Sequence, residues 1–326
     1  MTRRNDKGFV LVCVLWILAL LTVMAIGFGR RSMLERQAST YVFNHTQAMY
    51  MARGAIARGM VELRNKAIYD MINQEPGRTS YAQQWAKPMD LLQDPCYQEE
   101  GTEGTAAPST DEEGGDNKDV CTFTIRDESS RICINAADKS FLENIESLDR
   151  SILRKIDIRR MGGGDTGDPP QPFQTIEELR FLDDKISDKE WFGDEDTPGL
   201  KDLLTCWGDG QVNINTASAE VLNCIPDADE GIVGAIDAFR KGGDGILGTE
   251  DDQDFKDWAD LTAKAGLGGD SLAALQQYCK FDSQVFTITG IATQRNGKIV
   301  ATCVATVVVA DGMAGVIKWR EEIVES

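Results

Sequence analysis

The chain has 326 residues, 42% of them hydrophobic, and a formal net charge of −19 at pH 7. This length and apolar content are enough for a buried core, with room for two domains or one domain with a large insert, and they exclude a disordered chain. The negative charge makes the protein as a whole repel nucleic-acid phosphates and anionic lipid headgroups, so cations are its more natural ligands.

The first predicted element is a membrane-spanning helix. Residues 9–29 carry no charge, and as a helix rising about 1.5 Å per residue this run crosses about 30 Å of hydrocarbon. The alternative is a cleaved secretory signal, because Ala25-Ile26-Gly27 has the form of a small-x-small cleavage site.

The helical pattern continues beyond the apolar run. Apolar residues recur at steps of three and four from Leu34 to Leu63, and no proline precedes Pro76. We therefore predict one helix from Phe9 to about Lys66, roughly 85 Å long at 1.5 Å per residue. Its transmembrane half covers residues 9–29 and its amphipathic half residues 30–66. A helix that continues through Gly27 in this way argues against signal-peptide cleavage at that position.

A short basic leader ending in Lys7-Gly8, then Phe9, then an apolar helix that runs into an amphipathic one resembles the type IV prepilin class. The resemblance implies that residues 1–8 are a leader, that a prepilin peptidase cleaves between Gly8 and Phe9 on the cytoplasmic side, and that the new Phe9 amine is methylated. It also implies a pilin-like fold, with the long helix packed on a small antiparallel sheet.

One departure from that class is informative. Cys13, the fifth residue after the expected cleavage, stands where most members carry a glutamate that pairs with the N-terminal amine of the neighbouring subunit and so offsets the cost of a charge in lipid. A subunit with no neighbour above it does not need that carboxylate. In this the chain resembles the K-type minor pseudopilin of type II secretion, which sits at the tip of the pseudopilus.

Residues 67–118 read as helix or loop that turns into an acidic, Gly/Thr-rich stretch between Cys96 and Cys121. We expect a flexible excursion there, which a disulfide between these two cysteines would close. The other cysteines form no CxxC pair, which argues against a zinc ribbon or a thioredoxin-type site. In an oxidising compartment the seven cysteines outside the apolar run would form disulfides and leave one spare thiol, and the sequence does not determine the pairing.

The strand signals fall into two groups. CTFTIRDESSRICIN, from Cys121, alternates on both sides of a polar turn and predicts a hairpin. VFTITGIATQ, IVATCVATVVVAD and GVIKWREE predict a three-stranded meander, with Asn296-Gly297 as a type I' turn. The predicted fold is therefore α+β: a pilin-like domain of residues 67–134 and 283–326 that is interrupted by a mainly helical insert, residues 135–282.

The insert contains an internal repeat. ICINAADKSFLENI with Arg160 matches VNINTASAEVLNCI with Arg240 at a shift of 80, and Phe173 matches Phe255 at a slightly different offset. INTASAEVL resembles the paired helix-hairpin-helix modules of competence DNA receptors, so a membrane-anchored DNA receptor is the alternative function. DNA binding needs a glycine-rich hairpin whose N–H groups meet phosphate, but residues 226–231 carry three carboxylates, which favours a purely structural scaffold. DESSRICIN and VNINTASAEVL also resemble the most recognisable segments of the K-type pseudopilins, whose insert is of this helical kind.

The stretch KGGDGILGTEDDQDFKDW is the best candidate for a metal site. Carboxylates on a glycine-rich loop suit calcium, and the spacing differs from that of an EF-hand. A solvated acidic loop is the alternative, and the resemblance favours calcium because the insert of the K-type pseudopilins holds it. The expected ligands are Asp244, Asp251, Asp252, Asp254 and the carbonyl of Ile246. The corresponding loop of the first repeat, with Asp165 and Asp168, is a weaker candidate.

The sequence offers little for catalysis. His45 is the single histidine, and it lies on the amphipathic helix, where packing is the expected role. We therefore expect a non-enzymatic assembly protein. The resemblance implies a single-pass inner-membrane protein with its soluble domain in the periplasm, at the pseudopilus tip. The implied partners are minor pseudopilins of the I, J and H types, the prepilin peptidase, the inner-membrane secretion platform, and the outer-membrane channel or cargo.

Overall fold

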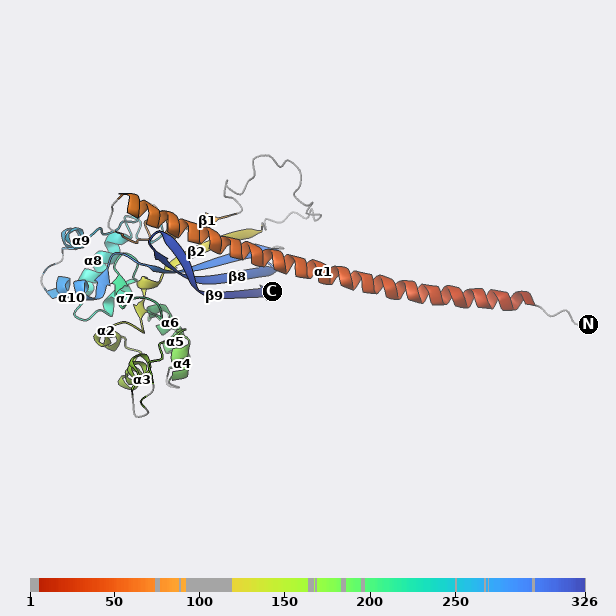
Figure 1. Cartoon of the computed structure of the whole chain (residues 1–326), viewed down its shortest axis with the longest axis horizontal. Coiled ribbons are helices and arrows are strands. Elements are labelled where there is room, and N and C mark those ends of the chain that lie inside the picture. The colour runs from red at the N-terminus through yellow and green to blue at the C-terminus, as the bar shows by residue number, and fades with distance from the viewer. Residues whose placement is uncertain are drawn as a thin grey trace, which may run out of the picture.

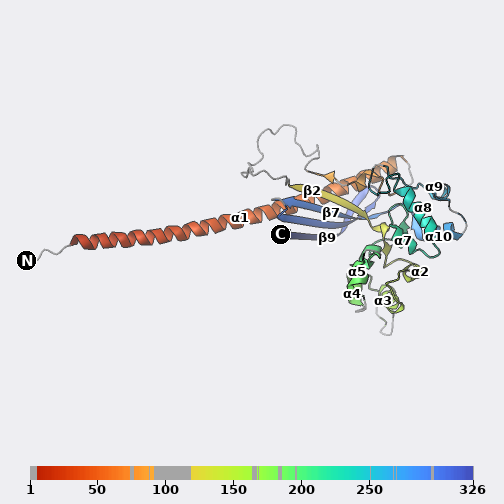
Figure 2. The same ribbon diagram turned by 180° about the vertical axis from the view of Figure 1, so that it is seen from behind.

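The computed structural model of the chain describes residues 6–73, 77–87, 89–91, 119–163, 167, 169–182, 186–194, 197–249, 251–266, 268, 270–294 and 297–325. Figure 1 shows a long helix that leaves a folded body, with a sheet against the helix and a group of short helices at the far end of the sheet. Figure 2 shows the same arrangement from behind.

Helix α1 spans Asp6–Asn73, so it begins before Phe9 and ends beyond the predicted Lys66. Its continuation is explained by the absence of proline before Pro76, since the residues before a proline are driven out of the helical conformation. The C-terminal part packs on the sheet through small residues, Ala48, Ala52 and Ala55, each with no exposed surface. These alanines let the helix backbone approach the sheet closely.

The sheet has the strand order β1-β2-β7-β8-β9, and every neighbouring pair is antiparallel. Its strands are β1 (Met89–Asp90), β2 (Val120–Asp127), β7 (Val285–Gln294), β8 (Ile299–Ala310) and β9 (Met313–Glu325). The predicted meander is confirmed as β7, β8 and β9. Alternate residues such as Phe123, Ile125 and Ile288 are buried under α1, whereas the opposite face carries threonines together with charged and aliphatic residues.

The predicted hairpin after Cys121 is wrong. β2 pairs with β7 over its whole length, and the residues after it turn out of the sheet through the short 3-10 helix η3 (Glu128–Ser130). The Asp127 side chain starts this turn by accepting the backbone N–H of Ser129 at 2.8 Å. The next strand, β3 (Ile132–Cys133), pairs in parallel with β4 (Leu204–Thr205), so the alternating pattern belongs to two sheets.

The insert consists of two units of the same construction. The first runs from β3 to β4 through α2 (Lys139–Glu143), α3 (Arg150–Met161), α4 (Glu178–Leu182), α5 (Asp188–Phe192) and α6 (Leu200–Leu203). The second runs from β5 (Val212–Asn213) to β6 (Cys279–Lys280), which are again parallel, through α7 (Ala219–Asn223), α8 (Glu230–Arg240), α9 (Trp258–Ala265) and α10 (Asp270–Tyr278). A further 3-10 helix, η1 (Gln84–Ala86), packs on the body.

Matching residues of the two units make matching bonds, which confirms the sequence repeat. Asn135 exchanges two hydrogen bonds of 2.8 and 2.9 Å with the backbone of Phe173. Asn215 does the same with Phe255, at 2.9 Å in both directions. In each unit a buried arginine, Arg160 or Arg240, donates to two carbonyls in the turn after the first strand, at residues 134 and 137 or 214 and 217. Each unit is thus held by one asparagine and one arginine.

The described cysteines outside the N-terminal part of α1 lie in two hydrophobic cores. Cys133, Cys206, Cys224 and Cys279 belong to the core of the insert, and Cys121 and Cys303 belong to the core under α1. Burial raises the pKa of Cys206 to about 12 and that of Cys224 to about 11, which keeps both thiols protonated. The four insert thiols and Cys303 are free, so the expected disulfides are not seen among them. Cys96 lies outside the described residues, and its predicted bond to Cys121 stays a prediction.

Two adjacent carboxylates at the end of β2 attach the insert to the body. Asp127 Oδ2 accepts hydrogen bonds from Asn213 at 3.0 Å and from the hydroxyls of Thr216 and Ser283 at 2.6 Å each. Glu128 bonds the hydroxyl of Thr205, that of Thr287 at 2.6 Å, and Arg131 at 2.6 Å. Asp127 therefore joins the second unit to the sheet and Glu128 joins the first. Neither role follows from the sequence pattern, because both depend on partners far away in the chain.

Candidate assembly surface and metal loop

The N-terminal part of α1 stands clear of the body (Figure 1). Within the described chain it is the one helix long and apolar enough to cross a membrane, with a mean hydropathy of 2.7 over its most apolar window, none of which is buried. Gly8 and Phe9, the predicted processing pair, both lie within the helix. Cys13 lies one turn further along and is partly exposed.

Between the apolar run and the body, α1 presents large apolar side chains to solvent. At about 100° per residue these side chains point to several sides of the helix axis, with polar residues between them. Large apolar side chains exposed on several sides of a helix are suited to packing against more than one neighbouring helix. We call this segment the α1 apolar surface; its members, each between 49% and 65% exposed, are Met33, Leu34, Tyr41, Val42, Phe43 and Tyr50. His45 lies within the same segment and stacks on Tyr41 with a ring separation of 4.1 Å, as expected of a packing residue.

The predicted calcium loop follows α8 and closes on itself. Asp251 Oδ2 accepts the backbone N–H groups of Gly243 at 2.6 Å and Asp244 at 3.1 Å, and Oδ1 accepts the Thr249 hydroxyl at 2.7 Å. These bonds lower the pKa of Asp251, that from Thr249 most. A side chain at Gly242, where φ is +62°, would meet the Asp251 carbonyl oxygen at 2.4 Å, so this position requires glycine.

The structure brings only some of the expected ligands together. Asp244 and Asp251 are neighbours in the loop, and the Ile246 carbonyl accepts the Thr249 hydroxyl at 3.1 Å. Asp254 is turned away and pairs with Arg78 at 3.1 Å. Asp252 gives one oxygen to the N–H of Gly248 at 2.6 Å, while its buried Oδ1 has no hydrogen-bond partner. Among the described residues no three acidic, histidine or cysteine side chains form a ready metal cluster. Asp165 and Asp168 lie outside the described residues.

The two helix N-termini that a helix-hairpin-helix module would offer to phosphate are capped by the protein itself. Asp149 accepts the N–H groups of Ser151 and Ile152 at 2.8 and 2.9 Å at the start of α3. Asp229 accepts the N–H of Gly231 at 2.7 Å at the start of α8. A phosphate at either position would have to displace a carboxylate and approach its charge, which disfavours the DNA-receptor alternative.

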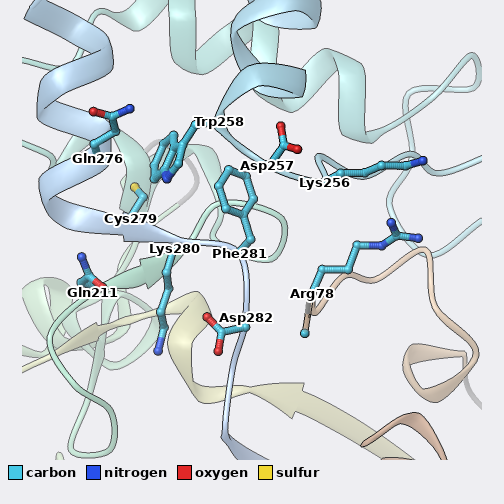
Figure 3. Close-up of a pocket in the computed structure, with 11 residues that line it drawn as sticks. Arg78, Gln211, Lys256, Asp257, Trp258, Gln276, Cys279, Lys280, Phe281 and Asp282 are labelled. Atoms are coloured by element: carbon cyan, nitrogen blue, oxygen red, sulfur yellow. The ribbon is translucent and has the colours of Figure 1, made fainter. Parts of the chain in front are cut away.

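A cleft of about 480 Å³ lies between the second unit and the segment after α1, and Figure 3 shows the residues that line it. Two of its charged side chains are held in ion pairs, Arg78 with Asp254 at 3.1 Å and Lys280 with Asp209 at 2.8 Å. The Trp258 and Phe281 rings pack edge to face, 4.8 Å apart. Burial raises the pKa of the Cys279 thiol, which keeps it protonated. The cleft therefore lacks an activated nucleophile with an adjacent base.

No family model and no curated protein matches the sequence. Solved structures do match, among them a chain of the crystal structure of the GspK-GspI-GspJ complex from the type 2 secretion system of enterotoxigenic Escherichia coli. The match has a TM-score of 0.53 and 15% sequence identity, and it covers 88% of this chain and 99% of that one. The chain has the pilin-like fold of a subunit of that complex. In this fold the helix, the sheet and the helical insert belong to one architecture, and the expected α+β class is confirmed.

Proposed function

We propose that this protein is a K-type minor pseudopilin of a type II secretion system, which initiates or caps the pseudopilus with other minor pseudopilins. The observation that carries the proposal is the α1 apolar surface: six large apolar side chains on several sides of the helix are about half or more exposed in the described part of the chain. Burial of such side chains stabilises each by about 1.5–3 kcal/mol, and neighbouring α1 helices of a filament would provide it.

Several features support a place at the tip. Cys13 stands where a repeating subunit would carry a carboxylate for the neighbour above, and the insert widens the end of the molecule farthest from α1's N-terminus (Figure 1). The I-type and J-type pseudopilins are the first expected partners, since the matching structure is a complex of GspK, GspI and GspJ, and the H type follows. Residues 9–29 would anchor the chain in the inner membrane, with the body in the periplasm facing the outer-membrane channel or cargo. The prepilin peptidase and the inner-membrane platform would act at the membrane end.

One preparation tests both processing and assembly. The full chain is taken from membranes that also contain I-type and J-type pseudopilins, and the mass of its N-terminal peptide and the co-purified subunits are measured. We expect a peptide that starts at methylated Phe9, and we expect both partners to co-purify. Val42→Glu, which places a charge on the α1 apolar surface, should reduce their recovery about tenfold.

The matched control is Arg154→Glu on α3, an exposed position on the insert, which should leave recovery unchanged. An intact Met1, or a start near Phe28, would contradict processing of the prepilin kind. Equal recovery with Val42→Glu and with the wild-type chain would show that the α1 apolar surface does not hold the partners.

We further propose that the loop of residues 242–254 binds calcium. Asp252 Oδ1 is the supporting observation, because a buried carboxylate oxygen without a partner is costly, and a cation satisfies it. Asp244, Asp251 and the Ile246 carbonyl would supply further oxygens. Asp254 could bind the ion only after its ion pair with Arg78 is broken. Calcium would fix the fold of the loop and has no catalytic part in this proposal.

Removal of calcium should therefore lower the melting temperature. A ligand present at about 100 times its Kd stabilises a protein by about 2.7 kcal/mol, which corresponds to about 5 °C or more for a chain of this size. Melting curves of the purified protein with calcium and with EDTA measure the shift. Asp252→Asn should abolish the shift, while Asp227→Asn, in the hairpin before α8, should keep it. Identical curves with calcium and with EDTA would refute the site.

A further inference from the structure

A groove of about 570 Å³ lies on the sheet face opposite α1. One wall is formed by β2, β7, β8 and β9, and the other by the first unit of the insert, including α6 and the residues that follow β4. Figure 1 shows α5 and α6 beside the end of the sheet nearest the insert, and Figure 2 shows α5 there from behind. We call this feature the sheet–insert groove. It is separate from the α1 apolar surface and from the loop of residues 242–254.

The sheet wall of the groove is built from two rows of residues that cross the strands. Residues directly opposite each other in an antiparallel sheet project to the same side, so both rows face the groove. Threonines lie within both rows; the first row has a cation at each end, and the second row ends in one cation. The first row is Arg126, Thr287, Thr306 and Lys318, and the second is Thr124, Thr289, Val304 and Arg320.

Two cations of the sheet wall have no carboxylate partner among the described residues. Arg126 and Arg320 are exposed, and neither forms an ion pair with any acidic side chain that the structure describes. Lys318 reaches across the groove to the carbonyl of Gln174 at 3.3 Å. Some exposed cations elsewhere in the protein are paired, as Arg53 is with Glu321 at 2.7 Å and Lys189 with Asp194 at 2.7 Å.

The carboxylates that line the groove do not neutralise this wall. Glu128 is only 2% exposed, and it is already bound by Arg131 and by two threonine hydroxyls. Glu177 and Asp202 both belong to the insert wall. In a chain of net charge −19, three cations with unsatisfied charge on one face of one groove indicate a binding surface for an anion.

We propose that the sheet–insert groove binds an extended acidic segment of a partner polypeptide. Three strand spacings of about 4.8 Å separate Arg126 from Lys318, about 14 Å, which is the span of about four residues of extended chain. Acidic side chains on alternate residues would meet the cations, and the hydroxyls of Thr124 and Thr289 would donate to carboxylates or to backbone carbonyls. A nucleic acid carries a denser charge that the remainder of this acidic protein repels. The proposal does not depend on α1 or on the proposed place at the tip.

Fluorescence anisotropy of the full chain in neutral detergent tests this proposal. The probe is a short labelled peptide in which glutamate alternates with serine, and the control peptide carries glutamine in place of glutamate. We expect saturable binding of the glutamate peptide at low salt that weakens at physiological salt, and about tenfold weaker binding of the glutamine peptide. Arg126→Glu with Arg320→Glu should weaken glutamate-peptide binding about tenfold or more, because attraction becomes repulsion at two positions.

Arg150→Glu with Arg154→Glu is the matched control, since it makes the same change in net charge at two exposed positions on α3. At an ionic strength of about 0.1 M it should alter binding less than about twofold, because charges beyond a Debye length of about 10 Å are then screened. If the charge-reversed groove variant has a lower melting temperature than the wild-type protein, the binding measurement is made with Arg126→Gln and Arg320→Gln instead. Absence of binding to the wild-type chain, equal weakening by both pairs of variants, or equal binding of both peptides would overturn the proposal. Groove-dependent binding of duplex DNA in preference to the acidic peptide would also overturn it.

Discussion

Replacing Asp127 with alanine is expected to lower the free energy of unfolding by about 3–5 kcal/mol. The side chain is fully buried and accepts hydrogen bonds from Ser129, Asn213, Thr216 and Ser283. Its removal leaves buried donors without an acceptor in a place that water cannot easily reach. Because these donors come from η3, β5 and the segment before β7, the loss should loosen the second unit of the insert from the sheet.

Denaturant unfolding of the purified protein measures this loss. Asp138→Ala is the control, since Asp138 caps α2 at the surface, where it accepts the N–H of Ser140 at 2.9 Å, and its loss should cost only about 1 kcal/mol. A change of less than about 1 kcal/mol on Asp127→Ala would show that the buried network does not hold the insert.

The same carboxyl group has a predictable pH dependence. Burial raises the pKa of Asp127, and the hydrogen bonds from Ser283, Thr216, Ser129 and Asn213 oppose that rise. The folded protein therefore binds this proton more tightly than the unfolded chain does. The contribution of Asp127 to the unfolding free energy falls as the pH rises from about 3.9, the ordinary value, through the folded pKa. Asp127→Asn lacks this proton, so the wild-type protein should lose stability relative to the variant over that range. An opposite slope would mean that the ionised form is the preferred one.

Replacing Gly290 with alanine is expected to destabilise the body by about 3 kcal/mol. Gly290 lies on β7 directly beneath α1, and a Cβ atom there would come within 2.5 Å of the Ala52 carbonyl oxygen and 3.0 Å of the Ala55 side chain. The obstructing atom belongs to a helix backbone, so it cannot move aside as a side chain would. The helix must lift from the sheet, and the alanine packing of Ala48, Ala52 and Ala55 is lost.

Denaturant unfolding followed by Trp85 fluorescence reports on this region, because the Trp85 ring packs against Phe286 at 5.4 Å in the core under α1. Gly54→Ala is the matched control, because Gly54 lies on α1 with nothing within 4 Å of an added Cβ atom. This substitution should stabilise the helix by about 0.5–1 kcal/mol. If Gly290→Ala were as stable as the wild-type protein, α1 would not be packed on β7 as closely as the structure has it.

Much of the architecture follows from local pattern. The long helix, the β7–β8–β9 meander and the repeat within the insert were all predicted, because periodicity, turn residues and self-similarity are properties of neighbouring residues. Arg160 and Arg240 were aligned by the repeat, and the structure shows that both tie the turn after the first strand of their unit. The carboxylate caps Asp149 and Asp229 likewise follow from their place before a helix.

Other features depend on contacts between residues far apart in the chain. The segment from Cys121 has a hairpin pattern, yet β2 pairs with β7, because the partner that completes the sheet lies beyond the insert. The sequence Asp127-Glu128-Ser129 does not show that these two carboxylates attach different units of the insert to the sheet. The loop carboxylates alone do not predict that Asp254 turns to Arg78.

The sequence by itself thus determined the elements, their order and the repeat, since these arise from the spacing of apolar and turn residues. Only the tertiary structure decided which strands pair, where buried carboxylates find their donors, and that Arg126, Lys318 and Arg320 share one groove. Those outcomes depend on long-range packing, in which different chain segments compete for the same partners. The adopted arrangement is the one that pairs most buried polar groups and buries most apolar surface.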